Sequence, residues 1–142
     1  MEILLVEKDP MVRDHVKVGL KQFPELAVTV GEGYQGVGEL RTKQFDCVIL
    51  GVDPQDNESM QVLQHLRSFD QTTELVVITP SRSLRDFSAE KTKYGIHTFL
   101  PSPVELHEFF GFVGRFLERR TDRANGPVRK APKQPVATGR SG

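Results

Sequence analysis

The sequence predicts an α/β fold with a doubly wound, five-stranded parallel sheet, and two observations lead to this fold class. Short apolar runs alternate, five times over, with segments whose apolar residues recur at helical spacing. The runs are almost continuous in apolar residues, which is typical of parallel strands that are covered on both faces. Because such strands are joined by right-handed helical crossovers, we expect helices on both faces of one sheet, in a (βα)5 arrangement.

The first two repeats each begin with an apolar run. Residues 2–6 predict a strand, and Asp9 followed by Pro10 predicts a helix start, because Asp is a favourable N-cap and Pro suits the first helical position. The apolar spacing of this helix continues to Phe23, where we expect the helix to end. The second repeat consists of a strand at residues 26–30, a glycine turn at 31–33, and a short helix with Tyr34, Val37 and Leu40 on one face.

The other three repeats follow the same alternation. The third has a strand at residues 47–50 and a helix with Met60, Leu63 and Leu66 on one face. The fourth has a strand at residues 75–79 and a less regular helix over 84–94, which Gly95 ends in the position that a C-terminal glycine prefers. The fifth has a strand at residues 98–100 and a helix whose broad apolar stripe contains Leu106, Phe109, Phe110, Val113, Phe116 and Leu117.

Length and charge divide the 142-residue chain into a domain and a tail. Residues 1–120 suffice for one core, whereas residues 121–142 lack apolar periodicity and are expected to form a disordered basic tail or a linker containing Pro and Gly. Residues 1–118 hold 12 Lys and Arg against 18 Asp and Glu, and residues 119–142 hold seven against one. This acidic balance argues against nucleic-acid binding by the domain, so that only the tail could bind nucleic acid.

Nothing in the sequence predicts secretion or a membrane span. The longest apolar runs are strand-sized, far below the roughly 20 residues that a bilayer requires, and the N-terminus lacks the pattern of a signal peptide. A cytoplasmic location is therefore expected. The single cysteine, Cys47, lies within an apolar run and is interpreted as a buried hydrophobic residue.

Doubly wound sheets place their functional sites at the carboxyl ends of the strands. The residues expected at this edge lie in four segments, which are 7–9, 51–54, 79–81 and 101–103.

Four segments of the chain resemble the receiver domain of two-component response regulators, which has a flavodoxin-like fold. The resemblance covers residues 1–120 and rests on segments in the same order as in that family, namely 3–13, 45–52, 76–79 and 95–103. It implies a phosphoryl-accepting aspartate at the end of the third strand, two acids after the first strand that hold Mg²⁺, and a lysine before the last proline.

The residues at these positions depart from the family pattern. The acceptor position is Gly51, the acid pair is Glu7 and Lys8, and the lysine position is Ser102. Glycine cannot accept a phosphoryl group, and a lysine in place of a metal ligand opposes metal binding. We therefore expect a pseudo-receiver that is not an enzyme, needs no cofactor and does not bind Mg²⁺. We also hypothesise that Lys8 occupies the space of the metal and offsets the charge of Glu7 or Asp9.

Two further positions match the family's switch pair. Thr79 and Phe99 correspond to the hydroxyl and aromatic residues of this pair. The alternative, which we favour, is that Thr79 makes a local hydrogen bond at a strand end and Phe99 simply packs. The resemblance also implies a cis peptide bond between Ser102 and Pro103.

Three other groups of residues have ordinary interpretations. Asp53 could act as a displaced phosphoryl acceptor, which is the alternative function, but an Asp before a Pro more often forms a turn. The histidines have no metal-ligand spacing. The glycines at 31, 33, 36 and 38 lack the order of a phosphate-binding loop, so turn and helix-start roles are expected.

The expected function is phosphorylation-independent signalling through protein partners, with a homodimer as one option. In receivers, the fourth helix, fifth strand and fifth helix form the usual partner surface, which here implicates Arg85, Phe99, Phe112 and Arg115. Phe112 lies about 40° outside the stripe of the last helix at about 100° per residue, so it is either exposed or at the edge of the core. No membrane partner is expected.

Overall fold

The structure is a computed structural model that describes the fold of residues 1–125 and the side chains of residues 1–120. It confirms the predicted α/β class with a five-stranded parallel sheet. The chain groups into two units, the first formed by Met1–Leu106 and the second beginning at His107.

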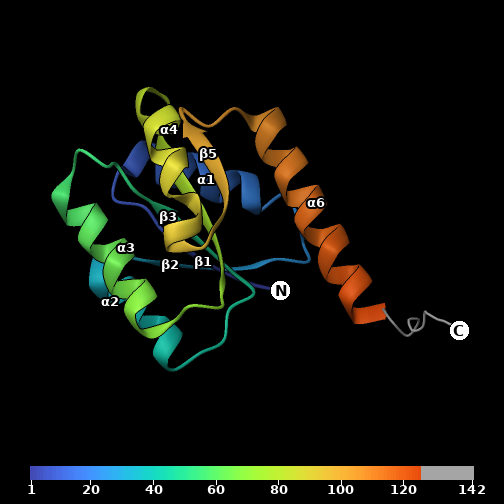
Figure 1. Ribbon diagram of the computed structural model, residues 1–142. Helices are drawn as coiled ribbons and strands as arrows, with labels where there is room; N and C mark the ends of the chain where they lie inside the picture. Colours follow the sequence, from blue (N-terminus) through green and yellow to red (C-terminus); the bar gives the residue numbers. More distant parts are fainter. Residues whose placement is uncertain (126–142) are drawn as a thin grey trace, which may run out of the picture. The chain divides into compact units, whose positions relative to one another are not determined.

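The sheet of the first unit has the strand order β2-β1-β3-β4-β5, with every neighbouring pair parallel (Figure 1). The strands are β1 (Glu2–Val6), β2 (Ala27–Gly31), β3 (Cys47–Gly51), β4 (Glu74–Pro80) and β5 (Ile96–Ser102). In the register, Gly51 pairs with Ile78, and Thr79 pairs with Pro101. All carboxyl ends therefore meet at one edge, which is the edge where the sequence predicts the site.

Helix α1 (Pro10–Leu20) begins as predicted and ends earlier than predicted. The Asp9 side chain accepts hydrogen bonds from the backbone N–H groups of Met11 and Val12, as an N-cap does. The predicted continuation to Phe23 is wrong. The N–H of Gln22 donates to the carbonyl of Gly19 and that of Phe23 to Leu20, and these three-residue spacings tighten the chain into a turn after Leu20.

The second and third repeats contain α2 (Gly33–Val37), which continues as the 3₁₀ helix η1 (Gly38–Arg41), and α3 (Asn57–Phe69). The expected single helix over 84–94 is instead three short elements, α4 (Ser81–Phe87), η2 (Ser88–Glu90) and α5 (Lys91–Tyr94). The hydroxyl of Ser88 donates to the carbonyl oxygen of Arg85 at 2.8 Å, a local bond that competes with regular helix geometry. Gly95 has a left-handed φ of 62°, which confirms its predicted role in ending the helix.

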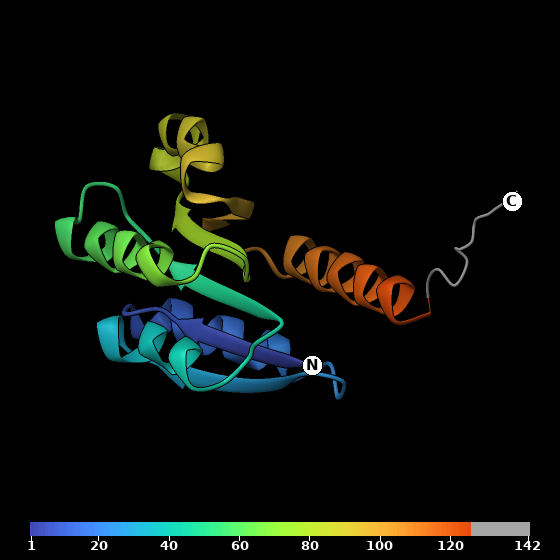
Figure 2. The ribbon, with the colours of Figure 1, turned by 60° about the horizontal axis from the view of Figure 1, so that its bottom comes forward.

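The core of the first unit lies on both faces of the central strands. On one face, Leu4, Val48 and Val77 pack with the buried side chains of α3. The alternate residues of the same strands, such as Leu5 and Ile49, are also buried and lie on the opposite face. Helix α1 covers that face, behind the strands in Figure 1, whereas α2, α3 and α4 lie in front. In the turned view of Figure 2, β2 is at one end of the unit and the yellow α4 segment at the other.

Arg67 of α3 joins the end of this helix to two other segments. Its guanidinium donates four hydrogen bonds to backbone carbonyl oxygens: to Tyr94 at 2.8 Å, and to Asp70, Thr73 and Gly95 at 3.0 Å each. Burial lowers the pKa of Arg67, but the group stays charged because a guanidinium group ordinarily loses its proton only far above neutral pH. The arginine therefore fastens α3 to the α5–β5 turn through the main chain alone.

The four glycines near α2 have different roles. Gly33 has a φ of +52°, which is the predicted turn role. A β-carbon on Gly31 would lie 2.6 Å from Cα of Gly36, and one on Gly36 would lie 2.8 Å from the carbonyl carbon of Gly31. These two glycines allow the backbones of β2 and α2 to touch, which the sequence interpretation missed. Gly38 has helical backbone angles and no atom within 4 Å of its β-carbon position.

Helix α6 (Leu106–Asn125) begins at the last residue of the first unit, and the rest of it belongs to the second unit. This helix continues beyond the boundary expected at Arg120, since no proline interrupts the chain before Pro127. The rest of the expected tail, residues 126–142, lies outside the described residues. Phe112 is only 4% exposed, so the option of an exposed Phe112 is wrong, whereas Phe110 is 37% exposed. The buried face has the spacing i, i+3, i+4, i+7, and is formed by Phe109, Phe112, Val113 and Phe116.

The structure also bears on two single expectations from the sequence. Cys47 is buried, as its apolar neighbourhood predicts. Among the helices in the described part of the chain, none combines the length and the apolar character that crossing a bilayer requires.

Candidate functional site

An open cleft of about 370 Å³ lies at the carboxyl ends of the strands. It brings together all seven residues that the sequence assigns to a degenerate phosphorylation pocket: Glu7, Lys8, Asp9, Gly51, Asp53, Thr79 and Ser102. The other lining residues are Val12, Val52, Asp56, Ser59, Ile78 and Pro80. The predicted residues therefore share one cleft, although what they do there stays a prediction.

The carboxyl group of Glu7 occupies the space above Gly51. A β-carbon on Gly51 would lie 2.5 Å from Cδ of Glu7 and 2.8 Å from Oε2, and nearer still to Oε1. Non-bonded carbon atoms rest at about 3.5–4.0 Å, so no side chain fits at position 51 unless Glu7 moves. A carboxylate thus lies beside the end of β3, but it extends from the residue that follows β1.

Burial raises the pKa of Glu7 above its ordinary value of 4.5, because a half-buried carboxylate loses part of its hydration. The nearby charge of Asp9 acts in the same direction. The backbone N–H of Asp9 donates to Oε2 of Glu7 at 3.0 Å and opposes this effect only in part. Glu7 is therefore a carboxyl group whose charged form is poorly stabilised.

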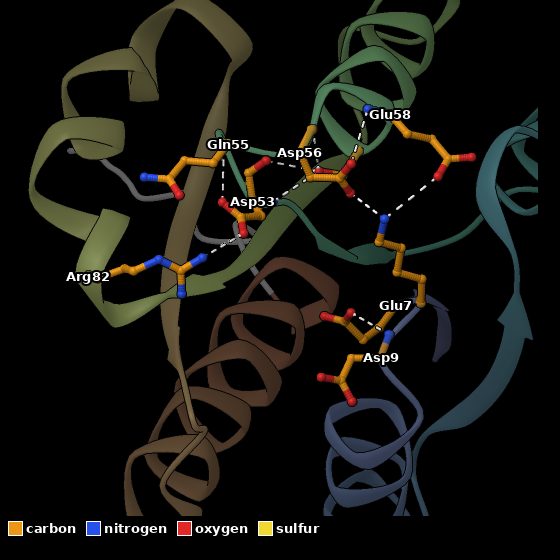
Figure 3. Close-up of polar contacts among 9 residues, drawn as sticks. Glu7, Asp9, Asp53, Gln55, Asp56, Glu58 and Arg82 are labelled. Carbon is orange, nitrogen blue, oxygen red and sulfur yellow. Dashed lines mark hydrogen bonds and ion pairs between the residues drawn. The ribbon is translucent and has the colours of Figure 1, made fainter.

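Lys8 forms ion pairs, but with acids that the sequence interpretation did not consider. Its ammonium group contacts Oδ2 of Asp56 and lies 3.6 Å from Oε1 of Glu58, both at the start of α3. This pairing raises the pKa of Lys8 and lowers that of Asp56. The hypothesis that Lys8 offsets Glu7 is confirmed only as a minor effect, because the charge of Lys8 lowers the pKa of Glu7 slightly while its ammonium group forms its ion pairs with Asp56 and Glu58. Figure 3 shows Asp56 and Glu58 side by side, away from Glu7 and Asp9.

Asp53 is engaged on both of its carboxylate oxygens. Oδ1 accepts the backbone N–H of Gln55 at 2.9 Å, which is the turn role predicted for an Asp before a Pro. Oδ2 forms an ion pair with Arg82 of α4 at 2.9 Å (Figure 3). Arg82 was missed from the sequence, because nothing in the local pattern connects α4 with the loop after β3.

Thr79 differs from expectation, whereas Phe99 packs as expected. Thr79 is fully buried, and its hydroxyl has no hydrogen-bond partner among the described residues, so the predicted local bond is absent. The next residue, Pro80, has no N–H to offer. Phe99 packs edge-on against Phe87, with ring centroids 5.3 Å apart. The Ser102–Pro103 peptide bond is cis, as the resemblance implies.

The donor atoms in the cleft do not form the Mg²⁺ site that the resemblance implies. Position 51 offers no ligand and position 8 offers a cation, whereas Mg²⁺ requires oxygen ligands in near-octahedral order. The carboxylate of Asp9 caps α1, with Oδ1 accepting the N–H of Met11 at 2.9 Å. Within the described part of the chain, no three His, Cys, Asp or Glu side chains are placed to hold a metal ion.

The residues predicted for partner contact do not form one exposed set. Arg85 and Arg115 are exposed, Phe99 is half-buried and Phe112 is buried. Only the two arginines are fully available on the surfaces of their own helices, α4 and α6.

The fold and the cleft define a class of signalling domain, in which a parallel (βα)5 sheet carries an acidic site at its strand ends. The sequence matches the response regulator receiver domain over residues 3–113, and the chain belongs to this family.

Two curated relatives are similar in sequence to this chain. The chain is 27% identical to the response regulator protein PmrA of Pseudomonas aeruginosa over 124 residues, covering 87% of this chain and 56% of the relative. It is 25% identical to the transcriptional regulatory protein QseB of Escherichia coli O157:H7 over 129 residues, covering 91% and 58%. The chain thus spans little more than half the length of these relatives.

Solved structures support the fold assignment. A CheY-like receiver domain protein from Methanospirillum hungatei has a TM-score of 0.68 at 18% identity, covering 86% of this chain and 97% of that chain. The REC domain of AraT from Geobacillus stearothermophilus has a TM-score of 0.71 at 11% identity, covering 87% and 97%. At these identities the likeness shows the fold alone.

Proposed function

We propose that this receiver domain signals through protein contacts without being phosphorylated at the end of β3. The observation that carries the proposal is the carboxyl group of Glu7 above Gly51. Position 51 has no nucleophile, and the carboxylate of Glu7 fills the space that an acceptor side chain would need. The domain is accordingly a pseudo-receiver and not an enzyme.

The chemistry of phosphoryl transfer supports the proposal. A carboxylate nucleophile must be placed within reach of its catalytic partners, and charge on the transferred group must be neutralised, usually by a divalent metal. In this cleft the cations already have partners, because Lys8 pairs with α3 and Arg82 pairs with Asp53. Mg²⁺-dependent phosphorylation is therefore not expected.

A partner surface on α4 and β5 fits the same proposal. Arg85 and Phe99 belong to these elements, and Arg115 is exposed on α6. Of the curated relatives, PmrA is named a response regulator protein and QseB a transcriptional regulatory protein, and both are longer than this chain. We infer that the domain passes its signal to a further protein segment, either in the same polypeptide or in a partner.

The decisive experiment is incubation with a small acyl phosphate and Mg²⁺, followed by intact mass measurement. We expect no added phosphoryl group in the wild type. The control variant Asp53→Asn examines the alternative acceptor. A mass gain that this variant abolishes would establish Asp53 as a displaced acceptor and overturn the proposal.

The partner surface needs a separate measurement. Proteins retained by the immobilised wild type are compared with those retained by Arg85→Glu and by Gln64→Glu, where Gln64 is an exposed residue of α3. Loss of the same partner only with Arg85→Glu supports a surface on α4. Equal retention by all three proteins would exclude Arg85 from the contact.

A further inference from the structure

Two of the carboxylates in the cleft have no cationic partner. Among the acids that line it, Asp53 is paired with Arg82, and Asp56 is paired with Lys8. Glu7 and Asp9 accept backbone N–H groups, and neither forms an ion pair with any residue of the described chain. The charge of Lys8 lowers the pKa of Glu7 only as a minor effect, so the cleft retains negative charge beside the half-buried Glu7, where a further cation would be stabilised.

An independent observation comes from the hydroxyl of Thr79. Thr79 lines the same cleft and is fully buried, and its Oγ1 atom has no hydrogen-bond partner among the described residues. A buried polar group without a partner costs free energy, commonly about 1–3 kcal/mol. Ser102 lines the cleft as well, so that the lining contains two hydroxyl-bearing residues in addition to Glu7.

We propose that the cleft binds a primary ammonium group, supplied by a lysine side chain of a protein partner. An ammonium group has three hydrogen-bond donors and a compact charge, which suits a carboxylate and two hydroxyl groups. A divalent metal is a poorer match, because the described residues do not provide a ligand set for one. The larger planar guanidinium of arginine prefers two-pronged carboxylate contacts.

The state of Glu7 agrees with this assignment. Burial raises its pKa, so the ionised carboxylate is poorly stabilised when the cleft holds no cation. An ammonium group beside Glu7 would restore the lost stabilisation through a charge-assisted hydrogen bond. The lysine source rests on the proposed function, since it requires that the domain work through protein contacts.

The direct test is an NMR titration of ¹⁵N-labelled protein with Nα-acetyl-lysine-N-methylamide and with n-butylammonium chloride. Tetramethylammonium chloride, which has the same charge but no N–H donor, is the matched control. We expect saturable shifts at the amides of Asp9, Val52 and Thr79 with the first two compounds only. In Glu7→Gln the affinity should fall about tenfold, as for loss of a charged hydrogen bond.

Each outcome of this titration decides a definite point. Equal shifts with tetramethylammonium, or no saturable shifts with any amine, would overturn the ammonium site. Binding of n-butylammonium without binding of the capped lysine would exclude a protein source and leave a free amine. None of these outcomes bears on phosphorylation, so the inference can fail while the proposed function stands, and the reverse also holds.

A second variant places the ammonium group on the chain itself. Ser102→Lys should raise the melting temperature if the cleft accepts an ammonium group, and Glu7→Gln should remove this gain. Gln64→Lys, on the exposed face of α3, controls for the added charge. No gain with Ser102→Lys, or an equal gain with Gln64→Lys, would count against the proposal.

Discussion

Cδ of Glu7 lies 2.5 Å from the position that a β-carbon on Gly51 would occupy. The end of β1 and the end of β3 therefore compete for one volume, and the absence of a side chain at position 51 leaves this volume to Glu7.

Replacing Gly51 with Ala should displace the carboxyl group of Glu7. The bond from the N–H of Asp9 to Glu7 would be lost, so we expect faster hydrogen exchange at the amide of Asp9 and a loss of about 1 kcal/mol in the free energy of unfolding. The same change in a Glu7→Ala background should cost little more. An equal cost in both backgrounds, measured by urea unfolding, would show that the two positions do not interact.

The raised pKa of Glu7 predicts a pH-dependent effect of Glu7→Gln. Because the folded state raises the pKa above 4.5, ionisation of Glu7 opposes folding at neutral pH, and below the unfolded pKa both states are protonated. The variant should therefore melt up to a few degrees higher at neutral pH, and this gain should vanish as the pH falls below about 4.5. A gain independent of pH would contradict the assigned cause.

The carbonyl contacts of Arg67 predict a large loss on truncation. Arg67→Ala removes four hydrogen bonds and leaves three part-buried carbonyl oxygens without this partner, so we expect a loss of about 2–4 kcal/mol in the free energy of unfolding. Arg85 is exposed and provides the control. Arg85→Ala should change the free energy of unfolding by less than about 0.5 kcal/mol. Similar unfolding midpoints for the two variants would refute this role of Arg67.

Gly36, which lies close to another backbone, and Gly38, which does not, provide a test position and its control. Gly36→Ala forces the backbone of α2 away from Gly31, and we expect a loss of about 1–3 kcal/mol. Gly38→Ala meets no atom within 4 Å and should be neutral or slightly stabilising, because alanine favours a helical backbone. Thermal unfolding of both variants measures the difference, and the reverse order would exclude the close contact as the cause.

The family resemblance makes a reconstruction possible. The fourfold variant Glu7→Asp, Lys8→Asp, Gly51→Asp and Ser102→Lys restores each group that the resemblance implies for phosphorylation. We expect it to gain one phosphoryl group from a small acyl phosphate when Mg²⁺ is present. The same variant with Asn at position 51 is the control, and a mass gain in this control would place the acceptor elsewhere.

Periodicity predicted the strands and most helices, because it directly reports which residues are buried. Its limits are visible in α6, where the assumed stripe was centred one position away, so that Phe112 is buried and Phe110 is more exposed. In the fourth repeat, the chain forms three short elements where the pattern predicts one helix, and the bond of Ser88 to Arg85 lies at the first junction. Such local hydrogen bonds have no apolar signature.

In the cleft, the sequence predicted which residues lie at the strand ends, but it did not predict which side chains pair with one another. Strand-end positions predicted that Glu7, Gly51 and Thr79 would meet, since parallel strands end at one edge. The partners of Lys8 and Asp53 could not be predicted, because these pairings depend on loop geometry and side-chain direction. A lysine at position 8, where the resemblance implies an acid, indicated that this position does not hold a metal. It did not show that the lysine would pair with α3.

The four hydrogen bonds of Arg67 go to main-chain oxygens, which every residue type carries, and its guanidinium also lies 3.9 Å from Oδ1 of Asp70. A substitution at Thr73 or Tyr94 therefore keeps the acceptor if the backbone keeps its path, but it alters the hydroxyl bond of Thr73 to Asp70 or the core packing of Tyr94. The connection between α3 and the α5–β5 turn therefore depends on the arginine and on the backbone path at Tyr94 and Gly95.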